Sequence, residues 1–424
     1  MSPSLKQPFS TPPREHAAAG ATMLAPAQQR RTPAALARCP CCNQAGADAP
    51  FYAVDSLPIH SCLLVETQAA ARSFPRGSLA LHRCAACGFI WNARFEQDRM
   101  RYAPDYEEVQ TCSPKFQAFQ SGLVKRLTAR HRLYGRRIVE IGCGKGDFLR
   151  ELCRHAQATG VGIDPSYRGP LSLADEDITF LREHYGAQHA SIEADFVCCR
   201  HTLEHIPDPF DFMRLIVESL RGRAEPIVFV EVPDMRRVLT EGAFWDVYYE
   251  HCSYFTAGSL TRLFHAVGLE VMDVAYDFDE QYLLVEGRLA PEAELADPAD
   301  DAAEPVSDWA ADFACCVDRQ LSELAAFLQP HFDARRQVVL WGGGSKAVSL
   351  LTSLPQRDRI RHVVDVNPVK HGKFIPGGGQ EVVAPDALRR LRPDVVVVMN
   401  DIYREEISAT LCELGLHPEL IALH

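Results

Sequence analysis

The stretch Arg137-Ile-Val-Glu-Ile-Gly-Cys-Gly-Lys-Gly146 decides the fold, because an apolar strand runs directly into three alternating glycines. A helical pattern begins immediately afterwards, at Asp147. Glycines at such a turn let the backbone pass under a nucleoside and bring helix N-terminal amides near it. A second apolar strand, 158–163, ends at Asp164, about 20 residues past the loop, where a carboxylate can accept hydrogen bonds from ribose hydroxyls. We therefore expect a nucleoside-containing cofactor to lie over Gly142, Gly144 and Gly146.

Strand and helix patterns alternate on both sides of this loop and again near the end of the chain. Such alternation predicts parallel sheets built from βαβ units. The chain has 424 residues, which is enough for two or three domains. We expect an α/β protein with one Rossmann-like sheet in 101–290 and a second Rossmann-like domain in 309–424. The segment 291–308 between them, with seven acidic and no basic residues, is expected to be a linker.

The start of the chain and its overall charge exclude several classes of protein. Residues 1–35 are rich in Pro and Ala without periodicity, which predicts a disordered tail. They contain no apolar stretch of the kind found in a signal peptide, and no run approaches the roughly 18 apolar residues of a membrane span. The net charge of −12 argues against a general nucleic-acid binder. We expect a cytoplasmic protein whose 15 cysteines stay reduced.

Two cysteine pairs define a small domain in 36–100. Cys39-Pro-Cys-Cys42 and Cys84-Ala-Ala-Cys87 both have the C-x-x-C spacing, in which two thiolates can converge on one ion. Together they predict a closed four-sulfur zinc site that stabilises the domain, although Cys41 is an alternative to Cys42. A redox pair or unrelated thiols is the competing interpretation. The long insert between the pairs must fold back as a hairpin or loop.

The glycine turn itself distinguishes between cofactors. A dinucleotide fingerprint has the pattern G-x-G-x-x-G, whereas here Glu140 precedes three alternating glycines, as E-x-G-x-G-x-G. This turn resembles motif I of class I S-adenosylmethionine-dependent methyltransferases. The resemblance implies that Glu140, the three glycines and Asp164 bind this cofactor. Later segments agree with that family in order, namely 195–209, 225–233, 258–268 and 281–287. A plain Rossmann sheet with a chance glycine run is the alternative.

An aromatic segment, 244–255, follows the predicted fifth strand and is expected to lie over the mouth of the cofactor site. It contains Tyr248-Tyr-Glu-His251. A histidine can remove a proton from a carbon next to a carbonyl, and a tyrosine hydroxyl can stabilise the enolate that forms. The competing interpretation is an aromatic lid in which His251 is an ordinary loop histidine.

These features together resemble the three-domain sugar C-methyltransferases, which act on nucleotide-linked 4-keto-deoxyhexoses. The resemblance extends from Cys39 to the end of the chain. It implies that Tyr248 stabilises the enolate, that His251 is the general base and that His205 is a second active-site histidine. It also implies a tyrosine just after the zinc domain, for which Tyr106 is preferred over Tyr102. The serine-rich stretch that follows this tyrosine in the family is replaced here by 107–114.

The last block repeats the strand, glycine turn and helix at Gly342–Gly344, and its next strand ends at Asp365. Taken alone, this pattern would indicate a NAD site. The C-terminal domain of the family that the chain resembles has the same pattern and closes over the substrate without a redox cofactor. Lys370 and Lys373 follow, either as contacts for a substrate diphosphate or as solvated side chains.

The sequence thus predicts an S-adenosylmethionine-dependent enzyme that methylates a carbon alpha to a ketone. Its partner would be a small molecule, in the simplest case a nucleotide-linked keto-sugar, and it would be a monomer or a weak homo-oligomer. Three alternatives stay open: an O-methyltransferase of a glycan or metabolite, a non-catalytic cofactor-binding interaction protein, and a dinucleotide oxidoreductase.

Overall fold

The computed structural model describes residues 38–45, 49–102, 105–107, 109–173, 176–290 and 304–423. The predicted tail at 1–35 and residues 291–303 of the predicted linker lie outside this set.

The central domain is built on an eight-stranded sheet with the order β11-β12-β9-β8-β4-β5-β7-β6. The strands are β4 (Arg137–Ile141), β5 (Thr159–Ile163), β6 (Ser172–Leu173), β7 (Ile178–Leu181), β8 (Phe196–Arg200), β9 (Ile227–Pro233), β11 (Leu269–Asp277) and β12 (Tyr282–Leu289). Strands β7, β5, β4, β8 and β9 run parallel, whereas β6, β11 and β12 pair antiparallel with their neighbours. The predicted Rossmann-like sheet is confirmed.

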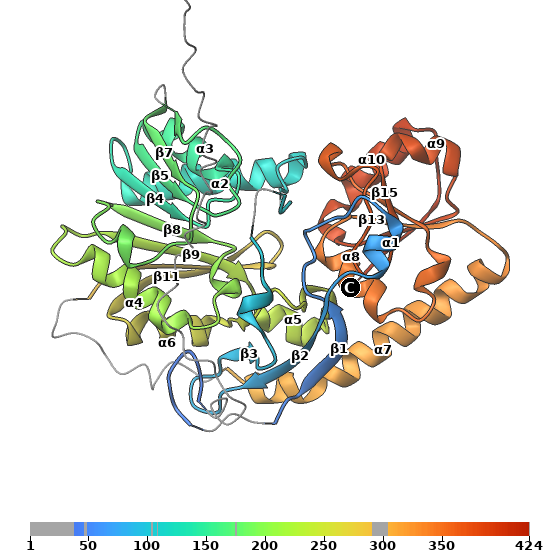
Figure 1. Ribbon diagram of the computed structural model, residues 1–424, viewed down its shortest axis with the longest axis horizontal. Helices are drawn as coiled ribbons and strands as arrows, with labels where there is room; N and C mark the ends of the chain where they lie inside the picture. The colour runs from blue at the N-terminus through green and yellow to red at the C-terminus, as the bar shows by residue number, and fades with distance from the viewer. Residues whose placement is uncertain are drawn as a thin grey trace, which may run out of the picture. The chain divides into compact units, whose positions relative to one another are not determined.

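Helices cover both faces of this sheet (Figure 1). They are α2 (Pro114–His131), α3 (Asp147–Ala156), α4 (Pro209–Leu220) and α6 (Ala257–Ala266); a further helix, α5 (Met235–Glu241), follows β9. Apolar side chains of α2 and α3 pack on one face of the sheet, and those of α4 and α6 pack on the other. Helix α2 begins where the Ser113 side chain accepts a hydrogen bond from the Phe116 amide, with proline at its first position.

The N-terminal domain has a four-stranded sheet with the order β1-β2-β3-β10. Its elements are β1 (Tyr52–Pro58), α1 (Gln68–Arg72), β2 (Arg76–Arg83), β3 (Ile90–Asn92) and β10 (Ser253–Tyr254). The insert between the cysteine pairs forms the antiparallel pair β1–β2, so the predicted fold-back is confirmed. Strand β10 comes from the aromatic segment 244–255 and pairs with β3. This segment therefore belongs to two domains at once.

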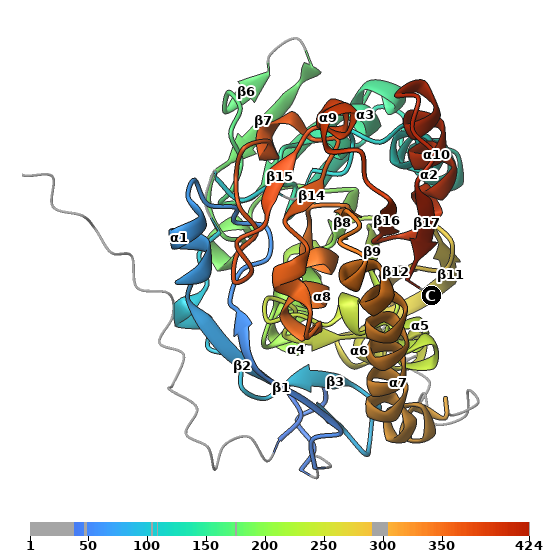
Figure 2. The same ribbon diagram turned by 90° about the vertical axis from the view of Figure 1, so that its right-hand side faces the viewer.

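The C-terminal domain is a parallel five-stranded sheet with the order β15-β14-β13-β16-β17 (Figure 2). Its strands are β13 (Val338–Trp341), β14 (His362–Val364), β15 (Glu381–Val383), β16 (Val395–Val398) and β17 (Glu419–Ala422). Its helices are α7 (Val306–Asp333), α8 (Ser345–Ser353), α9 (Leu388–Leu391) and α10 (Arg404–Glu413). The second Rossmann-like domain is thus confirmed, and the expected boundary at 309 falls inside α7.

Helix α7 joins the C-terminal domain to the N-terminal sheet. Its Phe313 ring lies 5.0 Å from the ring of Tyr52 and 6.3 Å from that of Phe51, both edge-on. Within the described residues, no helix combines the length and the apolar character that crossing a membrane requires.

Candidate active site

The glycine turn after β4 is shaped by close packing. Gly142 has a φ of +73°, and a Cβ there would lie 1.8 Å from Oγ1 of Thr202, in the loop after β8. Gly146 has a φ of +81°, and a Cβ there would lie 2.6 Å from the Phe180 ring. Both the backbone conformation and the space therefore require glycine. Without side chains at these positions, the backbone of the turn can pass directly under a bound nucleoside.

Asp164 stands at the tip of β5, as predicted, and is half-buried. Its Oδ2 accepts a hydrogen bond from the Gly144 amide at 2.9 Å, and its Oδ1 accepts one from the Ser166 amide at 2.6 Å. Each carboxylate oxygen can accept more than one hydrogen bond. The side chain is thus oriented by the backbone and keeps acceptor capacity for ribose hydroxyls. The turn and this carboxylate together fit a nucleoside cofactor.

Glu140 occupies a different environment. Its side chain is buried within the core, and burial raises its pKa to about 8, against the opposing charge of Arg200. One of its oxygens has no hydrogen-bond partner among the described residues. Arg200 is itself held by Glu231 at 2.9 Å. Glu140 is thus buried near the carboxyl end of β4, and its contact with the cofactor stays a prediction.

Tyr248, which is half-buried, and His251, which is buried, form a pair in the segment 244–255. The hydroxyl of Tyr248 lies 2.8 Å from Nε2 of His251, and the two ring centroids are 4.0 Å apart. The segment begins with the short helix η6 (Phe244–Asp246) and ends in β10. The structure thus brings the predicted base and the predicted enolate-stabilising residue into direct contact.

His205 completes a second side of this site. It ends the short helix η5 (Leu203–His205) after β8, and its ring lies 4.8 Å from that of His251. Its Nδ1 lies 3.1 Å from the carbonyl oxygen of Glu250. A carbonyl oxygen can only accept, so this nitrogen carries a proton and the other ring nitrogen keeps a lone pair in the neutral form; we assign this tautomer from the hydrogen bonds.

The tyrosine that meets His205 is Tyr102, whose hydroxyl lies 3.0 Å from Nδ1. The preferred candidate, Tyr106, is also buried, with its ring 5.3 Å from that of Tyr102. Its backbone carbonyl accepts a hydrogen bond from Nζ of Lys145, in the glycine turn, at 2.9 Å. Tyr102 thus contacts His205 directly, while Tyr106 connects its own segment to the cofactor loop; the role of Tyr106 toward the substrate stays a prediction.

Glu250 ties the aromatic segment to the N-terminal domain. Its buried carboxylate accepts hydrogen bonds from the Ser61 amide, from Oγ of Ser61 at 2.6 Å and from Nδ1 of His60 at 3.2 Å. Burial opposes ionisation of Glu250, but the hydrogen bonds and charge of His60 outweigh it and lower its pKa. Sequence reasoning missed His60 and Ser61 because no motif marks them.

Burial also sets the protonation state of His251. It lowers the pKa of His251 well below the usual value, and the neighbouring His205 lowers it further. Nδ1 of His251 and one oxygen of the buried Glu204 have no hydrogen-bond partner among the described residues. Ligand-capable atoms of Glu204, His205 and His251 all lie within 4.8 Å of one another. A neutral imidazole with a free nitrogen beside a carboxylate is suited to accept a proton.

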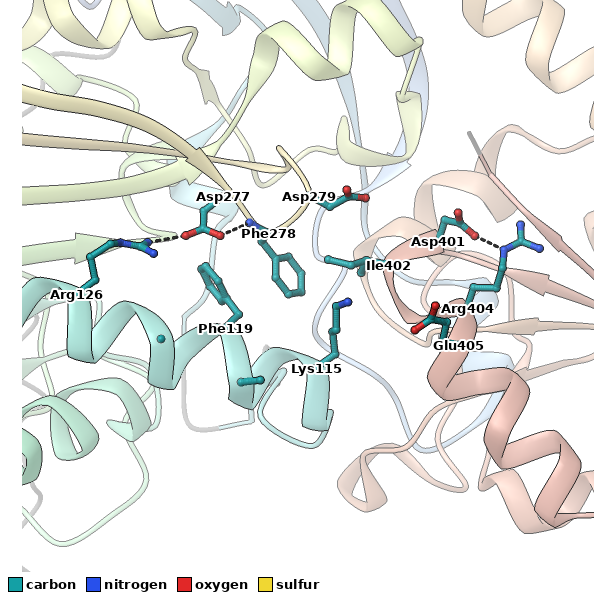
Figure 3. A pocket seen from close by; sticks show the side chains of 12 residues that line it. Lys115, Phe119, Arg126, Asp277, Phe278, Asp279, Asp401, Ile402, Arg404 and Glu405 are labelled. Carbon is teal, nitrogen blue, oxygen red and sulfur yellow. Dashed lines mark hydrogen bonds and ion pairs between the residues drawn. The ribbon is translucent and has the colours of Figure 1, made fainter.

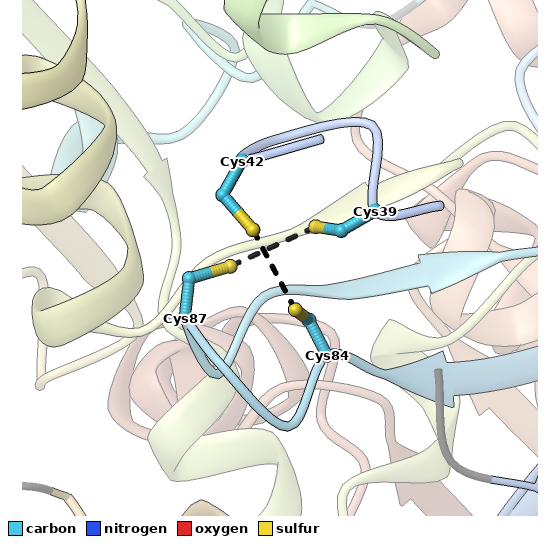
Figure 4. Close-up of side chains that lie close together, drawn as sticks. All are labelled: Cys39, Cys42, Cys84 and Cys87. Atoms are coloured by element: carbon cyan, nitrogen blue, oxygen red, sulfur yellow. Dashed lines mark hydrogen bonds between the residues drawn. The ribbon is translucent and has the colours of Figure 1, made fainter. Parts of the chain in front are cut away.

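The four predicted zinc ligands converge in the N-terminal domain (Figure 4). The Sγ atoms of Cys39 and Cys87 are 3.7 Å apart, as are those of Cys42 and Cys84. Zn–S bonds of about 2.3 Å at tetrahedral angles place sulfurs about 3.8 Å apart, so the cluster fits zinc. Cys41 is not in the cluster; its amide lies 3.4 Å from Sγ of Cys39.

A separate groove of about 720 Å³ lies between α2, the β11–β12 turn and the start of α10 (Figure 3). Two ion pairs lie in its wall, Arg126 with Asp277 and Arg404 with Asp401, both at 2.5 Å. Phe119 and Phe278 form part of its wall. None of the residues that line it belongs to the segment 244–255, so it is distinct from the histidine–tyrosine site.

Two family models match the chain on either side of the linker. Residues 115–274 match a methyltransferase domain, and residues 301–415 match the C-methyltransferase C-terminal domain. The chain is an S-adenosylmethionine-dependent methyltransferase of the C-methyltransferase family. The methyltransferase prediction and the recognition of a three-domain C-methyltransferase are thereby confirmed, and nothing supports the oxidoreductase alternative.

The chain is also similar to individual methyltransferases. The chain is 27% identical to the C-methyltransferase NovU of Streptomyces niveus, over 64% of this chain and 67% of NovU. It is 29% identical to a ubiquinone biosynthesis O-methyltransferase of Aeromonas salmonicida, over 34% of this chain and 66% of that protein. Among solved structures, magnesium protoporphyrin IX methyltransferase of Synechocystis with bound SAH matches 42% of this chain and 84% of its own, at 14% identity and a TM-score of 0.30.

Proposed function

We propose that this C-methyltransferase methylates a carbon alpha to the ketone of a nucleotide-linked keto-deoxysugar. The observation that carries the proposal is the Tyr248–His251 pair, 2.8 Å from oxygen to nitrogen, next to a second imidazole in the loop after β8. Carbon methylation needs a base and an enolate-stabilising donor at one place, whereas an existing hydroxyl needs only to be deprotonated.

The residues of the first glycine turn would hold the cofactor. Gly142, Gly144 and Gly146 would pass under the nucleoside, and Asp164 would accept hydrogen bonds from its ribose. When bound, S-adenosylmethionine supplies an electrophilic methyl group on a positively charged sulfur. The chain's own contribution is to hold the acceptor carbon in line with that group and to generate its carbanion.

Neutral His251 would take the proton from the carbon next to the ketone. The hydroxyl of Tyr248 would donate a hydrogen bond to the enolate oxygen that forms, and the proton would stay on the imidazole while the carbon is methylated. If Nε2–H of His251 donates to the Tyr248 oxygen, Nδ1 keeps the lone pair that accepts this proton. His205 is the second imidazole at the site, fixed by the Glu250 carbonyl.

Solvent deuterium exchange tests this proposal directly. The protein is incubated in heavy water with S-adenosylhomocysteine and a panel of nucleotide-linked 4-keto-deoxyhexoses. We expect deuterium to enter one carbon next to the ketone, and His251→Asn to abolish this exchange. His205→Asn shows whether the second histidine is needed for proton removal. Methyl transfer to oxygen without any exchange would replace the proposal by the O-methyltransferase alternative.

We also propose that the four cysteines hold a structural zinc ion. A closed four-thiolate site leaves no position for water, so the ion would stabilise the N-terminal domain and, through β3 and β10, the aromatic segment. Elemental analysis is expected to find one zinc per chain, lost in Cys84→Ser but kept in Cys41→Ser. Such thiolates persist where thiols are reduced, which is why we expect a cytoplasmic enzyme. We also propose that it is a monomer or a weak homo-oligomer.

A further inference from the structure

The start of α8, in the C-terminal domain, lies against the catalytic segment. Nζ of Lys346 lies 2.5 and 2.6 Å from the two carboxylate oxygens of Asp246, which ends η6 two residues before Tyr248. One turn later, Oγ of Ser349 donates a hydrogen bond to the carbonyl oxygen of Val247 at 3.2 Å. Two consecutive residues of the catalytic segment are thus held by one helix of another domain.

The Lys346–Asp246 ion pair is largely withdrawn from water, with 19% and 16% of the two side chains exposed. Burial lowers the pKa of Lys346, and the Asp246 carboxylate opposes that shift. Arg237, on α5, lies 3.2 Å from the same carboxylate. Breaking such a pair leaves an uncompensated buried charge, so the pair fixes the position of the backbone that leads into Tyr248.

The second contact of α8 reaches the residue before Tyr248. Ser349 and Val247 are both buried, so the hydrogen bond from Oγ of Ser349 to the Val247 carbonyl oxygen is withdrawn from water. Removing its donor would deprive a buried carbonyl oxygen of this partner.

The glycine turn before α8 does not offer the ribose site that its sequence pattern suggests. Oδ2 of Asp365 accepts from the Gly343 amide at 2.8 Å and lies 3.1 Å from Nζ of Lys370. Its Oδ1 accepts from the Asn367 amide at 2.8 Å. The acid that would bind a ribose in a dinucleotide site is therefore buried and paired with a lysine of its own domain.

We propose that Lys346 and Ser349 are positioning residues of the methyltransferase site, and that the helix after the second glycine turn serves to present them to the catalytic segment. Lys346 acts through Asp246, and Ser349 through the Val247 carbonyl, on the segment that carries Tyr248 and His251. The inference rests on the proposed function for its catalytic meaning, but the geometry can be tested without any substrate.

The first test observes His251 directly. The full chain is labelled with ¹³C-histidine, and the His251 signal is assigned by its loss in His251→Asn. We expect this signal to shift in Ser349→Ala and in Lys346→Met, and to return toward its original position in Lys346→Arg. The matched control is Glu406→Ala, which removes another contact between the same two domains, the 2.9 Å hydrogen bond from Ser113. It should leave the signal in place.

The second test measures enolisation. With a keto-sugar that the wild-type protein deuterates, Ser349→Ala and Lys346→Met should lower the maximal exchange rate by about 10- to 100-fold, as small misplacements of catalytic groups do. Affinity for S-adenosylhomocysteine should not change, because neither residue touches the first glycine turn.

The outcomes separate the two proposals. An unshifted His251 signal in both Ser349→Ala and Lys346→Met would overturn the positioning role. Ser349→Ala loses only a hydroxyl, so it keeps this test valid if Lys346→Met does not fold. Absence of exchange with every keto-sugar in the wild-type protein would instead count against the proposed function, while the shifts of His251 would still support the positioning role.

Discussion

The two glycine turns of this chain have the same local pattern and different uses. In each, a strand runs into glycines and a helix, and an acid ends the next strand. Asp164 accepts a hydrogen bond from its turn at 2.9 Å, and Asp365 accepts one from its own at 2.8 Å. Asp164 is half-buried, whereas Asp365 is buried and paired with Lys370. One lysine thus distinguishes a carboxylate that can receive a ribose from one that stabilises its own domain.

The lysines within the turns differ as well. Lys145 of the first turn donates to the carbonyl oxygens of Tyr106 and Ser166, at 2.9 and 3.0 Å. Lys346, after the second turn, reaches into another domain and pairs with Asp246. The comparison teaches that a strand–glycine–helix pattern specifies a local shape, and that the side chains around it decide whether that shape binds a cofactor or a neighbouring domain.

The largest effect is expected from replacing His251. His251→Ala should lower methyl transfer by about 10²–10⁴-fold, because the base is lost. Binding of S-adenosylhomocysteine should stay near normal, since the first turn is untouched. Steady-state kinetics together with calorimetric titration measure both quantities. Full turnover in this variant would show that another group removes the proton.

Matched substitutions of the two acids should separate the turns. Asp164→Asn removes a charged acceptor from the cofactor site and should weaken S-adenosylhomocysteine binding by about 10- to 100-fold. Asp365→Asn should leave that affinity unchanged and lower only the thermal stability of the C-terminal domain. Equal losses of affinity in the two variants would break the distinction between the turns.

A smaller effect is expected from one added methyl group in each turn. Gly142→Ala forces a left-handed residue against Thr202 and should lower the free energy of unfolding by at least about 1–2 kcal/mol. Gly344→Ala adds a Cβ where no atom lies within 4 Å and where φ is −116°, so stability should barely change. Denaturant unfolding of the two variants checks this contrast, and a reversed order would contradict the packing described for the first turn.

The smallest effect concerns pH. Because the pKa of His251 is lowered in the folded state, the unfolded chain binds more protons than the folded chain once the pH falls below about 6.5. This histidine therefore contributes stability that is fully present above that pH and is lost as the pH falls further. Between pH 7 and pH 5.5, the free energy of unfolding should fall by about 1 kcal/mol less in His251→Asn than in the wild type. Denaturant unfolding at the two pH values measures this, and an equal fall in the two proteins would show that His251 is not buried as described.

The parts of the molecule that the sequence predicted correctly are local. The glycine turn, Asp164 and the two cysteine pairs each depend on a few adjacent residues whose backbone shape follows from their type. Helix α7 was missed at its start because Val306 follows a stretch rich in acid and proline that was interpreted as a linker. Its buried positions nevertheless have helical spacing, at Val306, Ala310, Phe313 and Val317.

The parts that could not be predicted depend on distant contacts. Ser61 and Glu250 are 189 positions apart, and Lys346 and Asp246 are 100 apart, so no spacing rule relates them. Tyr102 and Tyr106 are neighbouring tyrosines, and nothing in the local sequence says which of the two rings contacts His205. Such choices depend on packing between domains, which a single sequence does not encode in any short pattern.

The most direct test of the central claim is the position of the transferred methyl group. The protein is supplied with S-adenosylmethionine carrying a ¹³C-methyl group and with the nucleotide-linked keto-sugar panel, and the product is analysed by NMR. We predict a labelled methyl group coupled to a sugar carbon next to the ketone. A labelled methyl group attached to oxygen, or no transfer to any member of the panel, would contradict the account.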